Sequence, residues 1–119
     1  MTYAFIEQTL PLLEARGIDL DVYYVASAEL FDLLSARKQR AIYPESVAMR
    51  AMGITGFTLP TMYRWIRSDA GRSMTLHPFS HGHYPGSGPG DRVIAEAGLD
   101  GDGQFAAILK FVGLRRAKQ

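Results

Sequence analysis

The sequence predicts an α/β fold in which helices cover both faces of a mostly parallel sheet, a three-layer α/β/α arrangement. Helical and strand-like segments alternate along the chain, and this order is typical of parallel strands joined by right-handed crossovers. The length of 119 residues, with 47% hydrophobic and 21% charged residues, suits one globular domain over residues 1–119. A β-branched and aromatic run at residues 20–26 supplies the first expected strand.

The first third of the chain reads as helix, strand, helix. Residues 3–16 place apolar side chains at helical spacing, and Gly17 ends that helix. Residues 20–26 are bounded by Asp and Ser and form the buried strand, whose two adjacent tyrosines are expected in the core on opposite faces. Ser27 is a good N-cap for a short helix. The basic segment 36–40 is expected to be exposed.

The alternation of strand and helix continues in the rest of the chain. Residues 46–52, which follow a proline, are predicted to form the second strand, and residues 59–66 a helix that ends by Gly71. Trp65 in that helix is expected to be partly buried against the sheet or a partner rather than to stack on a nucleotide. The remaining elements expected are a third strand and two helices, at residues 73–78, 89–97 and 103–112.

Composition excludes several classes of protein. The net charge of +1 provides no strong field to attract nucleic acid, so no nucleic-acid partner is expected. The absence of cysteine excludes disulfides, thiolate metal sites and cysteine nucleophiles. No apolar run approaches the roughly 20 residues of a membrane span, and the N-terminus does not resemble a signal peptide. We therefore expect no membrane partner and a cytoplasmic location.

The stretch GSGPGDRVIAEAGL at residues 86–99 has two interpretations. It fails as a phosphate-binding Walker loop because Gly90 is followed by an aspartate instead of lysine. It succeeds as the start of a helix, because Ser87 can cap the first turn and the following proline costs no hydrogen bond there. The helix start is favoured. The alternative is an anion site formed by Ser87, Gly88 and Gly90.

Three histidines cluster in the sequence just before this stretch. His77, His81 and His83 could together bind zinc or copper, which imidazole suits. No acidic residue lies among them and the spacing matches no fixed scaffold, so incidental histidines are favoured. A pH-sensitive contact or ligand is the remaining alternative.

The capped turn Ser87-Gly88-Pro89, followed by a helix and then Gly98-Leu99, resembles the C-terminal domain of transketolase-type thiamine-diphosphate enzymes. Residues 17–32 and 40–44 look like the first strand of that domain, the helix after it and the approach to its second strand. Residues 51–66 are closer to the homodimeric decarboxylase component of pyruvate dehydrogenase. The chain departs from the pattern at Met52-Gly53, where many relatives have an acidic residue before the glycine. Its loop at 79–87 is longer and carries more histidine.

This resemblance implies a non-catalytic part of a larger transferase or 2-oxo acid decarboxylase. Members of the family bind thiamine diphosphate and Mg²⁺ between their first two domains, and the third domain packs in the dimer. The chain is therefore expected to carry no catalytic, cofactor-binding or metal-binding residue, and to assemble with cofactor-bearing domains or subunits in a homo-oligomer. The alternative is a free-standing small α/β domain that binds an anionic metabolite at the histidine-rich loop and the Ser87 helix start.

Overall fold

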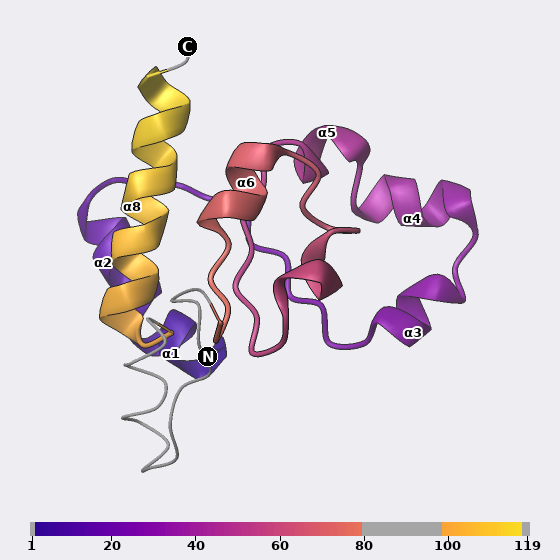
Figure 1. Cartoon of the computed structure of the whole chain (residues 1–119), viewed down its shortest axis with the longest axis horizontal. Helices are drawn as coiled ribbons and strands as arrows, with labels where there is room; N and C mark the ends of the chain where they lie inside the picture. The colour runs from indigo at the N-terminus through magenta and orange to yellow at the C-terminus, as the bar shows by residue number, and fades with distance from the viewer. Residues whose placement is uncertain (1, 80–98, 118–119) are drawn as a thin grey trace.

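The computed structural model describes residues 2–79 and 99–117, and in these ranges the chain is mainly helical. Helices α1, α2 and α8 lie on one side, α3 and α4 on the other, and α6 lies between the two groups (Figure 1). The elements are α1 (Thr2–Ala4), the π-helix η1 (Phe5–Thr9), α2 (Leu10–Ala15), α3 (Ala28–Asp32), α4 (Ala36–Ile42), α5 (Glu45–Ala48), the 3₁₀-helix η2 (Leu59–Met62), α6 (Asp69–Met74) and α8 (Gly101–Ala117).

The predicted α/β/α fold, and with it the transketolase C-terminal-like architecture, is wrong for the described part of the chain. Residues 2–79 and 99–117 contain no strand and only one isolated parallel bridge, between Ile54 and Leu76. Two main-chain hydrogen bonds form this bridge. The amide of Thr55 donates to the carbonyl of Leu76, and the amide of Leu76 donates to that of Gly53, both at 2.9 Å. A sheet that could be covered by helices is therefore not present in these ranges.

Helix-starting signals dominate two segments where strands were predicted. At residues 46–52, the N-cap Pro44 and the acidic Glu45 begin α5 instead. At residues 73–78, the first residues complete α6, which is capped where the Ser68 hydroxyl accepts a hydrogen bond from the amide of Gly71. Gly71 thus lies inside a helix and does not end one.

The first predicted strand is wrong because no described segment pairs with it. Residues 18–25 cross the molecule from α2 to α3 without helical or strand pairing, and Tyr24 is 72% exposed. The prediction that the two tyrosines of this run lie in a core is also wrong. β-Propensity expresses how a side chain fits a paired, half-buried surface, and it forms no strand where a partner strand is missing.

Several predictions that rest on helix caps and helical spacing are confirmed. The helical spacing of residues 3–16 corresponds to α1, η1 and α2, and Gly17 ends the run with a left-handed φ of 68°. Ser27 caps α3 by accepting from the amide of Leu30. The predicted helix at 103–112 is the centre of α8. The helix predicted at 59–66 is confirmed only in its first turn, as η2. The helix predicted at 89–97 lies outside the described residues.

The N-terminal segment is joined to α8 by buried polar side chains. The hydroxyl of Thr9, which is fully buried, lies 3.0 Å from the carbonyl oxygen of Gly101 and 3.1 Å from Oε1 of Gln104. The Gln104 amide nitrogen donates to the carbonyl of Leu99 at 2.8 Å. These partners satisfy polar groups that are costly to bury alone, so this junction connects residues more than 90 positions apart.

We expect Gly71→Ala to destabilise the fold by about 1–3 kcal/mol, the usual cost of overpacking. A β-carbon there would collide with the carbonyl oxygen of Ala51 and lie 2.8 Å from a methyl carbon of Ile66. The matched control is Gly113→Ala in α8, where nothing lies within 4 Å of the new carbon. It should stabilise by roughly 0.5–1 kcal/mol through helix propensity. Urea unfolding of both variants checks the pair, and equal effects would contradict the packing around Gly71.

Candidate functional site

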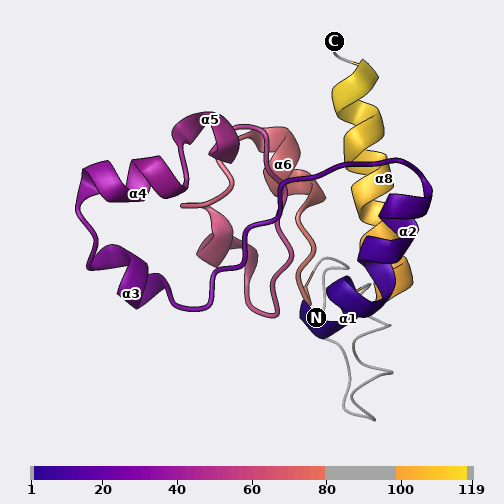
Figure 2. The same cartoon turned by 180° about the vertical axis from the view of Figure 1, so that it is seen from behind.

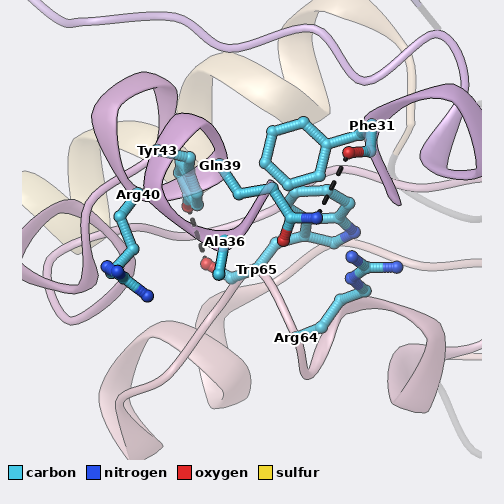
Figure 3. Close-up of a pocket in the computed structure, with 7 residues that line it drawn as sticks. All are labelled: Phe31, Ala36, Gln39, Arg40, Tyr43, Arg64 and Trp65. Carbon is cyan, nitrogen blue, oxygen red and sulfur yellow. Dashed lines mark hydrogen bonds between the residues drawn. The ribbon is translucent and has the colours of Figure 1, made fainter. Parts of the chain in front are cut away.

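Three aromatic side chains from separate elements meet in one cluster. Phe31 belongs to α3, Tyr43 caps α4, and Trp65 lies in the turn after η2. The ring centroids are 5.2 Å apart for Phe31 and Trp65 and 5.8 Å apart for Tyr43 and Trp65, both with tilted planes. Such arrangements stabilise beyond the burial of area alone. We call Phe31, Tyr43 and Trp65 the aromatic cluster (Figure 3).

Hydrogen bonds fix the positions of these rings. The Tyr43 hydroxyl donates to the carbonyl of Trp65 at 2.6 Å, across 22 residues of sequence. The side-chain amide of Gln39 donates to the carbonyl of Phe31 at 3.3 Å (Figure 3). It also donates to the carbonyl of Leu34 at 2.9 Å, and so joins α4 to the end of α3. The cluster therefore rests on main-chain carbonyls as well as on ring contacts.

Burial raises the pKa of Tyr43, and the neighbouring Tyr23 adds a smaller effect in the same direction. The ring centroids of the two tyrosines are 5.0 Å apart, edge to face. A raised pKa keeps the Tyr43 hydroxyl protonated, which preserves its ability to donate to Trp65.

Arg64 covers one side of the cluster. Its guanidinium lies 4.5 Å from the centre of the Trp65 ring and forms a two-pronged ion pair with Asp32, one contact being 3.1 Å between Nη1 and Oδ2. The hydrogen bond from Arg64 lowers the pKa of Asp32, and the pKa of Arg64 is raised in turn. Because both side chains are exposed to solvent, this pair orients Arg64 more than it stabilises the fold.

Two open hollows adjoin the aromatic cluster. The smaller, of about 240 Å³, lies between the cluster and the side chains of Gln39, Arg40 and Arg64. The larger, of about 400 Å³, is bounded by residues 23–27 on one side and by α3 and Ile42 on the other. Both hollows share the three rings as a wall. The larger has a lining of mostly aliphatic and aromatic side chains, which suits an apolar occupant.

Of the three histidines considered as metal ligands, only His77 lies in the described part of the chain. Burial lowers the pKa of His77, and its Nδ1 accepts a hydrogen bond from the amide of Phe79 at 3.3 Å. His81 and His83 lie outside the described residues, as do Ser87, Gly88 and Gly90. Within the ranges 2–79 and 99–117, no three His, Cys, Asp or Glu side chains are placed to hold a metal ion.

The aromatic cluster was missed by the sequence interpretation. Trp65 is 9% exposed, as the expectation of partial burial required, but it packs against helix ends rather than a sheet. The available signal was the aromatic content of the segments after Ser27, before Pro44 and after Pro60. The first and third were predicted as separate helices, and the second was not assigned to any element. Nothing local indicates that these regions meet.

No protein-family model, curated protein or solved structure matches this chain. Among the described helices, none is long and apolar enough to cross a bilayer. The arrangement of residues around the aromatic cluster is accordingly the main guide to function.

We expect Tyr43→Phe to lower the free energy of unfolding by about 1 kcal/mol, because the Trp65 carbonyl loses its partner in a partly buried site. Tyr24→Phe is the matched control, since that side chain is 72% exposed and its change should have almost no effect. Chemical denaturation followed by Trp65 fluorescence measures both. Identical midpoints for the two variants would contradict the assigned hydrogen bond.

We expect stability to fall as the pH is lowered from about 7.5 through the ordinary histidine pKa of 6.5, in part because of His77. The folded chain holds His77 at a lowered pKa, so the unfolded chain takes up a proton first and acidification favours unfolding. His77→Gln should reduce this pH dependence. Thermal unfolding at several pH values checks the difference, and an unchanged slope would contradict the assignment.

Proposed function

We propose that this chain is a non-catalytic assembly module that binds another protein through the apolar surface around its larger hollow. We call this surface the apolar face. It consists of large hydrophobic side chains that are between 42% and 72% exposed, contributed by the segment before α3, by α3 itself and by the end of α4. Its members are Val22, Tyr23, Tyr24, Val25, Leu30 and Ile42.

The main support for the proposal is the amount of apolar surface that the face exposes, compared with the amount that the core buries. In the described ranges, only a short set of apolar residues is buried, and the face alone exposes nearly as many large hydrophobic side chains. Contiguous apolar surface of this kind marks interaction sites in monomeric proteins. The buried apolar residues are Leu13, Ala48, Trp65, Ile66, Leu99, Ile108 and Phe111.

The polar groups beside the face support binding rather than chemistry. The Tyr43 hydroxyl is engaged with a carbonyl, and the charges of Arg64 and Asp32 neutralise each other. Neither arrangement resembles a nucleophile held by a base and an orienting group. Aromatic side chains are enriched at protein interfaces, and the apolar face exposes Tyr23 and Tyr24.

The role agrees with the one implied by the resemblance to thiamine-diphosphate enzymes, in which this part of the chain assembles and other domains hold thiamine diphosphate and Mg²⁺. The α/β/α fold of that family is not observed in the described residues, so the proposal rests on the apolar face. Cofactor-bearing domains remain the partner class that the resemblance implies.

A site-specific crosslink tests the proposal. We expect Tyr24→benzoylphenylalanine, at the most exposed position of the apolar face, to form a discrete covalent adduct on illumination in the cells that make this chain. Phe57→benzoylphenylalanine is the matched control, because Phe57 is 74% exposed but lies outside the face. Adduct at Tyr24 and not at Phe57 supports the proposal. No adduct, or equal yields at the two positions, contradicts it.

A further inference from the structure

The main chain of residues 19–26 has no hydrogen-bond partner among the described residues. The amide of Ile18 still bonds back to Leu13, and the carbonyl of Ser27 already accepts a bond within the next helix. Between these two points the chain passes on the face seen in Figure 2, in front of α8 and α6, and no other described segment covers it there. Within the described part of the chain, these eight consecutive residues therefore have amides and carbonyls without a protein partner.

The side chains of this run are exposed as well as its main chain. Tyr23 touches the ring of Tyr43, with centroids 5.0 Å apart, and is still 45% exposed. Its neighbours Val22 and Tyr24 are 55% and 72% exposed. A segment with β-branched and aromatic residues and an unpaired backbone is a template for strand addition by another chain.

We propose that a second copy of this chain covers the segment, with residues 19–25 of the two copies paired as antiparallel strands about a twofold axis at Val22, where the two valines form a hydrogen-bonded pair. This proposal rests on the proposed assembly function and names its partner. Such pairing is self-complementary, as a twofold interface requires. It joins the two apolar faces edge to edge and supplies the apolar contacts that an isolated pair of strands lacks.

Charge selects the antiparallel orientation. The segment begins with Asp19 and Asp21 and ends at α3, beside the basic helix α4. An antiparallel pair brings the acidic end of each copy toward the basic end of the other, whereas a parallel in-register pair stacks like charges. The acidic residues at the basic end do not cancel this charge. Asp32 pairs with Arg64, and Glu29 offsets only one of the three positive charges of α4. The basic residues of α4 are Arg37, Lys38 and Arg40.

Sedimentation equilibrium of the full chain is the first test. We expect a species of twice 13.2 kDa and at least about a tenfold increase in the dissociation constant for Val22→Pro, because proline removes a donor from the centre of the strand pair. Val22→Thr is the matched control, since it keeps the amide and the β-branched shape and should remain dimeric. Circular dichroism establishes that both variants are folded. A wild-type chain that stays monomeric, or a Val22→Pro dimer of unchanged affinity, overturns the proposal.

The orientation has its own test. The double variant Asp19→Asn/Asp21→Asn removes the attraction between unlike ends and should weaken an antiparallel dimer severalfold. In a parallel in-register dimer the same change relieves repulsion and tightens association, which would overturn the proposed geometry. Amide hydrogen exchange in residues 20–25 should slow as the chain is concentrated. Unchanged exchange in a dimer also counts against the pairing.

The crosslink at Tyr24 separates this inference from the proposed function. An adduct of twice the chain mass supports both. An adduct with a different protein, together with a monomeric purified chain, overturns the second copy as partner and leaves the assembly function standing. A monomeric chain that forms no adduct overturns both.

Discussion

The packing of Trp65 is the constraint on which half of this molecule depends. Its ring contacts Phe31 and Tyr43, its carbonyl accepts the Tyr43 hydroxyl, and Arg64 lies over its face. Helices α3 and α4 lie far from α8 in both cartoon views (Figures 1 and 2), so they gain nothing from the packing of the chain ends. These contacts, together with the hydrogen bonds of Gln39 from α4 to the end of α3, hold the two short helices in place. Open hollows remain beside the cluster.

The helical parts of this fold were predictable because their signals are local. A capping serine at Ser27, a left-handed Gly17 and the apolar spacing within α8 each act over one or two turns. The predicted sheet failed because strands depend on pairing between distant segments, which composition does not encode. The helix starts at Pro44-Glu45 and Ser68-Asp69 are equally local signals. The sequence interpretation took Pro44 as a break before a strand and placed the end of a helix at Gly71, so it missed both helix starts.

The candidate site was less predictable than the fold, for the same reason. Its central hydrogen bond joins residues 22 positions apart, and its ion pair, Arg64 with Asp32, joins residues 32 apart. Partial burial of Trp65 followed from its neighbours on the chain, but its partners did not. The histidines and the Ser87 turn were predicted as candidate sites because their residue types are common in metal and anion sites. Only His77 of that group lies in the described ranges, where its Nδ1 accepts a hydrogen bond from the amide of Phe79.

The buried junction of Thr9 with Gly101 and Gln104 has a consequence for biosynthesis. Thr9 is separated from Gly101 by 92 positions and from Gln104 by 95. The early helices therefore leave the ribosome long before the segment that completes their packing has been translated. Leu13 and Thr9 are almost fully buried in the folded chain. Until α8 has been translated, they are exposed to solvent or bound by a chaperone. Local structure around the aromatic cluster can form during this interval, which favours a vectorial order in which the middle of the chain folds before its ends meet.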